Sequence, residues 1–298
     1  WSRWIFGKEV RRPKKEIPVV TLDRASFDTP PDDDLRITWM GHSSVLVEID
    51  GRRILTDPIW SKRCSPSSLV GPSRFHPPPL SLDDLPPLDA VIVSHDHYDH
   101  LDKASVTVLA RSGVRFVVPL GVGAHLERWG IESSQITELD WWSTTRVGHV
   151  EITALPGRHF SGRGLGSMAT LWATWAIMGP EHRVFFSGDT GPLPGFEDIG
   201  EEYGPFDVTL MKIGAYDVAW PDIHLSPEQA LDAHVSLGGR LLIPIHWGTF
   251  NLAFHDWFEP PERLVAEASR RSIGIAVPRP GQMVSPADPP PVDRWWME

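Results

Sequence analysis

Four side chains that can bind a metal ion stand close together in the motif His95-x-His97-x-Asp99-His100. Imidazole and carboxylate groups suit Zn²⁺, and they also suit iron and manganese. His95 and His97 alternate along an extended segment, so their side chains project to the same side. Asp99 and His100 follow on a turn and offer a second pair of ligands to a neighbouring position. The pattern therefore predicts a metal centre rather than a chance surface cluster of histidines.

A pair of metal ions needs more ligands than this motif provides, and three later residues can supply them. His159, Asp189 and His246 each follow directly after an apolar run that predicts a strand. Taken singly, such a residue is more often a capping or hydrogen-bonded group than a ligand. Together with the first motif, the three are the expected completion of a two-metal site.

The elements that must position these residues alternate between strands and helices. Apolar and alternating runs predict strands at 36–40, 44–49, 52–56, 89–94, 115–118, 150–154, 169–178, 183–187, 207–213 and 241–245. Helices are predicted at 102–111, 121–130, 226–237 and 260–271. Strands in runs with interspersed helices favour a layered α/β domain.

The composition excludes several classes of protein. The chain has 298 residues, of which 41% are hydrophobic, so it can bury a substantial core. Its single cysteine, Cys64, excludes an intramolecular disulfide framework. No apolar run approaches the ~18–20 residues of a membrane-spanning helix. The net charge of −11 argues against a nucleic-acid partner, because such partners favour a basic face.

Charge and proline content divide the chain into three parts. We predict an N-terminal basic, proline-rich arm over 1–34, a main domain over 35–277 and a proline-rich, extended tail over 278–298. Residues 1–15 hold six Lys and Arg and one Glu, a net charge of 6 − 1 = +5. This arm could touch an anionic membrane surface, or it could pack its aromatic residues on its own domain. The chain starts with Trp rather than Met, so a preceding targeting signal remains open.

The motifs, taken in order, resemble those of the metallo-β-lactamase fold superfamily. The matching pieces are Thr56-Asp57-Pro58, the 95–100 motif, His159, Asp189 and His246. The resemblance implies an αβ/βα sandwich, in which two mixed β-sheets lie face to face and are flanked by helices. It implies one zinc ion held by His95, His97 and His159, and a second held by Asp99, His100 and His246. Asp189 would bridge the two ions, and Asp57 would support the ligands from a second shell.

Finer motifs resemble the N-acylphosphatidylethanolamine-hydrolysing phospholipase D family and its bacterial relatives. They are Leu55-Thr56-Asp57-Pro58-Ile59, Gly71-Pro72-x-Arg74-Phe75, residues 245–250 and Glu259-Pro260-Pro261. The resemblance implies a dizinc phosphodiesterase in which a metal-bridging hydroxide attacks a phospholipid or another phosphodiester. It also implies a homodimer. We expect a cytoplasmic or peripheral membrane protein.

Two further residues are candidate catalytic groups beside Asp189. His224 matches a family histidine that contacts the phosphate or assists the leaving group, but Ile223 stands where the mammalian enzyme has Gln. Its alternative role is purely structural, at the entry to a helix. Tyr98 lies between ligands and would either line the pocket or pack. Five aromatic residues could line an apolar channel or belong to the core: Trp60, Trp141, Trp142, Trp220 and Phe250.

Other functions remain open at this stage. The same metal pair could attack a carbonyl, as in a lactonase. A nuclease shares the ligand set but would need a larger basic surface than the arm. A non-catalytic, lipid-binding membrane scaffold is the alternative outside enzymes, although the complete ligand set argues against it.

Overall fold

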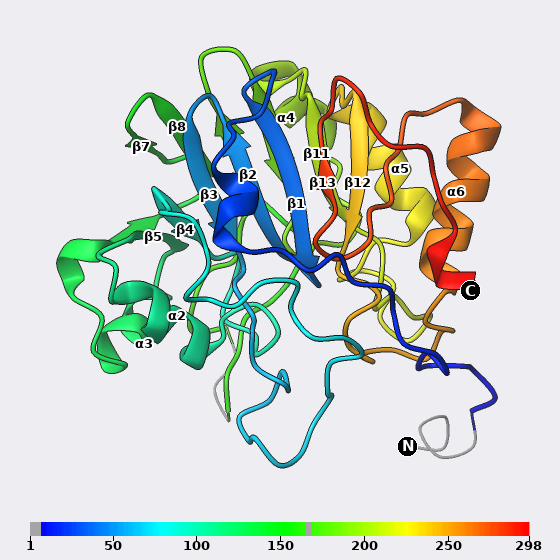
Figure 1. Ribbon diagram of the computed structural model, residues 1–298, viewed down its shortest axis with the longest axis horizontal. Helices are drawn as coiled ribbons and strands as arrows, with labels where there is room; N and C mark the ends of the chain where they lie inside the picture. Colours follow the sequence, from blue (N-terminus) through cyan, green and yellow to red (C-terminus); the bar gives the residue numbers. More distant parts are fainter. Residues whose placement is uncertain (1–6, 165–167, 298) are drawn as a thin grey trace.

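Thirteen strands and five α-helices build the part of the chain that the computed structural model describes, residues 7–164 and 168–297 (Figure 1). The strands are β1 (Leu35–Gly41), β2 (Ser44–Ile49), β3 (Arg52–Thr56), β4 (Ala90–Ile92), β5 (Arg115–Pro119), β6 (Ile136–Leu139), β7 (Thr144–Val147), β8 (Val150–Leu155), β9 (Thr174–Met178), β10 (Arg183–Phe186), β11 (Val208–Lys212), β12 (Leu241–Ile245) and β13 (Met283–Val284). The α-helices are α2 (Lys103–Ala110), α3 (Gly123–Arg128), α4 (Phe196–Tyr203), α5 (Pro227–Ser236) and α6 (Glu259–Arg271). Short 3₁₀ helices are η1 (Arg24–Phe27), η2 (Ser133–Gln135) and η3 (Trp295–Met297).

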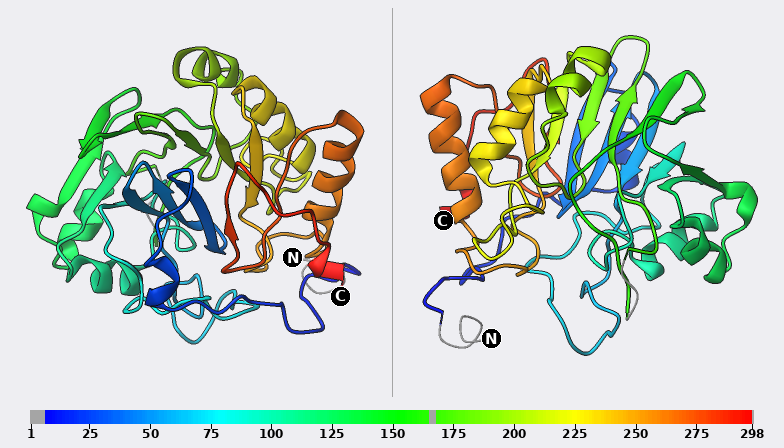
Figure 2. Two further views of the ribbon diagram at one scale, coloured as in Figure 1. Left: turned by 45° about the horizontal axis from the view of Figure 1, so that its top comes forward. Right: turned by 180° about the vertical axis from the view of Figure 1, so that it is seen from behind.

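The strands form two mixed sheets. The first has the order β13-β1-β2-β3-β4-β5-β6 and the second the order β12-β11-β10-β9-β8-β7. In the first sheet β1 to β3 are antiparallel and β3 to β6 parallel, whereas in the second β7 to β10 are antiparallel and β10 to β12 parallel. Helices α5 and α6 lie beside β11 and β12, and α2 and α3 lie at the other end of the molecule (Figures 1 and 2).

The alternation of side chains along the strands explains this layering. On one face of the first sheet, Val45, Ile54 and Ile92 join the core that the second sheet completes. On the opposite face, Leu46 and Val91 join a separate core that α2 and α3 cover. Successive strand residues point to opposite faces, so each strand serves both layers. The predicted αβ/βα sandwich of two mixed sheets with flanking helices is confirmed.

Most predicted elements are present, but the strand predicted at 169–178 is too long. Only Thr174–Met178 pairs with neighbouring strands. The preceding residues bond across to the first sheet instead: the Leu171 N–H donates to the Leu120 carbonyl, and the Ala173 N–H to the Ser94 carbonyl. The short elements β6, β7, α4 and β13 were not predicted from the sequence.

Both terminal segments pack on the main domain. Met283–Val284 extends the first sheet by pairing with β1. Trp295 and Trp296 are buried and, with Trp39 and Trp247, form a group of four indoles that we call the tryptophan cluster. In the N-terminal arm, the Val10 carbonyl accepts a hydrogen bond from the Trp257 N–H.

Candidate metal centre

The strand directions bring the predicted ligands to one edge of the sandwich. Strands β1, β3 and β4 run in the same direction in the first sheet, and β8, β10 and β12 run in the same direction in the second. The loops that follow these strands therefore emerge at one edge of each sheet. They carry the His/Asp cluster, defined here as His42, His95, His97, Asp99, His100, His159, Asp189 and His246.

One half of the cluster consists of three histidines. His97 Nδ1 lies 2.8 Å from His95 Nε2 and 3.2 Å from His159 Nε2. Nitrogen atoms at such separations, on rings that are roughly perpendicular to each other, point into one shared space. These three residues could hold one metal ion, as the resemblance implies.

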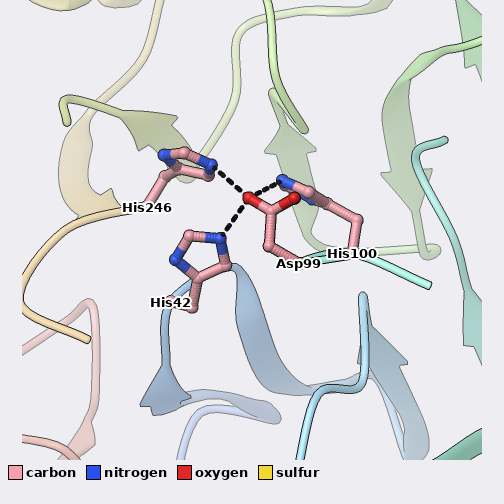
Figure 3. Close-up of side chains that lie close together, drawn as sticks. All are labelled: His42, Asp99, His100 and His246. Carbon is pink, nitrogen blue, oxygen red and sulfur yellow. Dashed lines mark hydrogen bonds and ion pairs between the residues drawn. The ribbon is translucent and has the colours of Figure 1, made fainter. Parts of the chain in front are cut away.

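The other half surrounds Asp99 (Figure 3). Its Oδ2 atom lies 3.3 Å from His246 Nε2 and 3.4 Å from His100 Nε2. A third nitrogen, His42 Nε2, lies 3.0 Å from the same oxygen. All four residues together could hold a second ion.

Asp189 lies between the two halves. Its Oδ2 atom is 3.1 Å from His246 Nε2, 3.3 Å from His100 Nε2 and 3.8 Å from His159 Nε2. One carboxylate thus reaches histidines of both groups. This is the arrangement that a bridging ligand requires.

A buried second layer fixes which nitrogen of each ring faces the cluster. Asp57 Oδ2 accepts hydrogen bonds of 2.6 Å from His100 Nδ1 and from the Ser94 hydroxyl. The Ser94 oxygen in turn lies 2.9 Å from His95 Nδ1. Each ring therefore directs its Nε2 atom inward. The structure places Asp57 outside the cluster, in contact with the predicted ligand His100.

The electrostatics of the cluster keep carboxylates charged and most imidazoles neutral. Burial lowers the pKa of His159 to about 3 and that of His95 well below its ordinary value. Burial opposes the ionisation of Asp99 and Asp189, but the surrounding imidazoles hold the pKa of both carboxyls well below the usual range. Burial would also lower the pKa of His100, yet three nearby carboxylates raise it well above its ordinary value.

The donor set fits a metal ion because it contains polar atoms that the described residues do not satisfy. His100 Nε2 and Asp189 Oδ1 are buried and have no hydrogen-bond partner within residues 7–164 and 168–297. A buried polar atom without a partner costs about 1–3 kcal/mol. Coordination of a cation would offset this cost for both atoms.

The remaining predicted residues lie at different distances from the cluster. His224 is adjacent: its Nδ1 lies 3.8 Å from Asp189 Oδ2, and its ring packs against His159. Tyr98 lies under the Arg163 guanidinium, 4.1 Å from its ring centre. Within the described residues, the structure records no hydrogen bond from Tyr98 to the cluster, so its catalytic role stays a prediction.

The five candidate channel aromatics do not form one wall. Phe250 contacts the His42 ring edge-on. By contrast, Trp60 packs in the core under α2, and Trp142 stacks on Tyr203. Trp141 packs against the core between the sheets, whereas the Trp220 ring lies tilted against Phe254.

Two buried polar residues near the cluster were not predicted from the sequence. His42 satisfies the rule that identified His159, because it is a polar residue directly after an apolar strand. The sequence offers no separate reason to assign it to the metal centre. Lys212 ends β11, is fully buried and donates a hydrogen bond of 2.6 Å to the Gly214 carbonyl. No sequence signal distinguishes this lysine from a surface residue.

Two mixed sheets with a His/Asp cluster at one edge define a metal-dependent hydrolase. The family model for the beta-lactamase superfamily domain matches residues 52–247, and the chain therefore belongs to this superfamily. It is 37% identical over 262 residues to N-acyl-phosphatidylethanolamine-hydrolyzing phospholipase D 1 of Caenorhabditis elegans, covering 83% of this chain and 73% of the relative. This similarity confirms the resemblance to the N-acylphosphatidylethanolamine-hydrolysing phospholipase D family and its bacterial relatives.

Two other similarities agree with this assignment. A metal-dependent hydrolase of Methanopyrus kandleri is 30% identical over 246 residues, covering 82% of this chain and 95% of the relative. The solved structure of a metallo hydrolase from Ignicoccus hospitalis shares the fold with a TM-score of 0.65 and 24% identity, covering 84% of this chain and 97% of that chain.

Proposed function

We propose that this protein is a two-metal phosphodiesterase that hydrolyses a phospholipid such as an N-acylphosphatidylethanolamine. The observation that carries the proposal is the division of the cluster into two ligand groups with Asp189 between them. His95, His97 and His159 would hold one ion, and Asp99, His100 and His246 the other. Zinc is the ion that the ligand types favour, and iron or manganese would also suit them.

A metal pair supplies Lewis acidity and a nucleophilic hydroxide at neutral pH. The chain's own residues contribute orientation and charge. Asp189 and Asp99 bring two negative charges to the centre, and the Asp57–Ser94 layer holds His95 and His100 in the tautomers that can ligate. In-line attack on phosphorus also needs a group that donates a hydrogen bond or a proton to the leaving oxygen, on the side opposite the attacking nucleophile.

We propose that His224 donates a hydrogen bond to that leaving oxygen. Its side chain is 13% exposed and borders a cavity of about 530 Å³. Tyr216, Phe254 and Val218 contribute apolar surface to the same cavity. One edge of the imidazole therefore faces Asp189, while the residue also lines a space that can receive the leaving group. We assign His224 the role of hydrogen-bond donor to the leaving oxygen.

Ile223 stands where the mammalian enzyme has Gln, and its backbone contacts a residue of the cluster. The Ile223 carbonyl accepts a hydrogen bond of 3.1 Å from His159 Nδ1, which directs His159 Nε2 to the cluster. This position therefore lacks the amide donor of the mammalian enzyme. We therefore extend the substrate class to other glycerophospholipids.

A phospholipid substrate places the protein at a membrane surface. No helix among the described residues is long and apolar enough to cross a bilayer. Peripheral contact through the basic arm is part of the proposal, since Lys8, Lys14 and Lys15 are exposed. Residues 1–6 of that arm lie outside the described part of the chain.

The test is a direct comparison of substrates with the metal-loaded full chain. We expect hydrolysis of bis(p-nitrophenyl) phosphate and of N-acylphosphatidylethanolamine in mixed micelles, and loss of both activities after chelation. Turnover of lactones without turnover of either phosphodiester would replace the proposal with a carbonyl-directed hydrolase. Metal binding without any hydrolysis would favour a lipid-binding scaffold.

A further inference from the structure

His42 occupies a turn whose backbone is held in an unfavourable conformation. Its φ of 55° lies in the left-handed region, which costs a non-glycine residue about 1–3 kcal/mol. Three hydrogen bonds hold the turn in place. The His42 N–H donates to the Thr249 hydroxyl at 2.7 Å, and the His42 carbonyl accepts from Trp39 Nε1 at 2.8 Å and from the His246 N–H at 2.9 Å. The fold therefore fixes this histidine against His246.

The side chain points at the oxygen on which two predicted ligands converge (Figure 3). Nitrogen atoms of His42, His246 and His100 lie 3.0, 3.3 and 3.4 Å from Asp99 Oδ2. A carboxylate oxygen has two lone pairs and cannot accept three well-directed hydrogen bonds. Donor atoms that each lie about 2.1 Å from a common ion are about 3.0–3.5 Å apart. The three distances fall in that range.

Among the described residues, His42 Nε2 has no polar partner other than Asp99 Oδ2. The residue is 1% exposed, and its ring packs against His246 at 4.1 Å and edge-on against Phe250 at 5.2 Å. Its Nδ1 atom is buried and has no hydrogen-bond partner within the described ranges. Packing and the Nε2 contact alone fix the orientation of the ring.

We propose that His42 is a further ligand of the metal position formed by Asp99, His100 and His246. This inference rests on the two-metal site of the proposed function and deepens it. With Asp189, this position has five protein donors, whereas the position of His95, His97 and His159 has four. Five donors suit an ion that accepts five or six ligands better than a tetrahedral one. The two positions therefore differ in metal preference.

The alternative role of His42 is that of a hydrogen-bond donor that orients Asp99. Two variants separate the roles. His42→Gly removes the side chain and suits the left-handed backbone. His42→Gln keeps an N–H that can reach Asp99 but removes the imidazole. His234→Gln is the matched control, because His234 is a buried histidine that bonds Thr209 instead of the cluster.

The experiment is a titration of metal-free full-length protein with Co²⁺, followed by its visible absorption. We expect two equivalents in the wild type and in the control. Both His42 variants should bind one equivalent more weakly, by at least the factor of about 10–100 that loss of an outer-layer partner causes, with altered bands for that ion. Wild-type affinity and bands in His42→Gln would show a donor role and overturn the proposal, as would unchanged binding in both variants.

The titration needs no substrate, so its outcome is independent of the reaction. Two cobalt equivalents without phosphodiester hydrolysis would contradict the proposed function and leave the ligand assignment intact. A wild type that binds fewer than two equivalents would overturn both. Circular dichroism of each variant distinguishes loss of a ligand from loss of the fold.

Discussion

The replacement Asp57→Asn should weaken metal binding without removing any predicted ligand. Asp57 Oδ1 accepts the Ser94 N–H at 2.6 Å, and an Asn oxygen can keep this bond. The amide nitrogen would then take the place of Oδ2, which now accepts from His100 Nδ1. An amide N–H donates, so the Nδ1 atom of His100 would have to accept and the proton would move to Nε2. Nε2 is the atom that faces the cluster.

The magnitude follows from this change of tautomer. To bind a metal, His100 in the variant must return its proton to Nδ1, where it would face the amide N–H. A lost hydrogen bond to a charged group costs about 1.5–3 kcal/mol. Disruption of a second-layer partner typically weakens metal binding 10–100-fold, or about 1.4–2.8 kcal/mol. The two estimates agree, and we expect a loss of affinity in this range at the His100 position.

The assay is competition with a chromogenic chelator, combined with metal analysis of the dialysed protein. Asp50→Asn is the matched control, because Asp50 makes the same kind of contact, with its Oδ1 atom 2.6 Å from His182 Nδ1. Asp50 follows β2, which runs opposite to β3, so it lies at the edge of the first sheet opposite the cluster. This control should lose stability but bind metal like the wild type. If Asp57→Asn also binds metal like the wild type, the tautomer argument is refuted.

Three further predictions concern stability and specificity. Burial and the nearby Arg271 lower the pKa of His234 to about 4, below the ~6.5 of an unfolded chain. The unfolded state therefore binds the extra proton, and the free energy of unfolding falls as pH decreases from 6.5 towards 4. In His234→Asn, the decrease in the free energy of unfolding between pH 6.5 and 4.5, measured by denaturant titration, should be smaller by about 2 kcal/mol. Trp295→Ala should lower the free energy of unfolding by about 3–5 kcal/mol, and a denaturation midpoint equal to that of the wild type would contradict the packing described for the tryptophan cluster. Ile223→Gln should leave the metal content unchanged, because the backbone carbonyl that accepts from His159 remains. The kcat/KM for N-acylphosphatidylethanolamine should rise about tenfold relative to that for bis(p-nitrophenyl) phosphate. A drop in metal content would contradict the distinction between the backbone contact and the side chain.

The sequence predicted those parts of the site that depend on local pattern. His159, Asp189 and His246 each follow an apolar strand, and the strand directions bring them together because parallel strands end at one edge. The layered fold could be predicted for the same reason, because the periodicity of apolar residues along the sequence indicates the strands and helices. The helix α5 was predicted to within one residue at each end, because Ser226 and Pro227 mark its start.

The parts that the sequence did not predict depend on contacts between distant segments. The role of His42 requires the Thr249 hydroxyl and the His246 backbone, which lie about 200 residues further along the chain. The beginning of β9 depends on bonds to loops of the other sheet rather than on the apolar run itself. The position of Tyr98 depends on Arg163, which a separate loop supplies.

The tryptophan cluster has a consequence for the order in which the protein matures. Trp39 bonds the His42 carbonyl, Trp247 follows His246 directly, and Trp295 and Trp296 pack against this pair of indoles from the far end of the chain. During synthesis, the motif at 95–100 leaves the ribosome long before residues 295–296. The half of the cluster around Asp99 therefore acquires its full packing only after residues 295–296 have emerged as well.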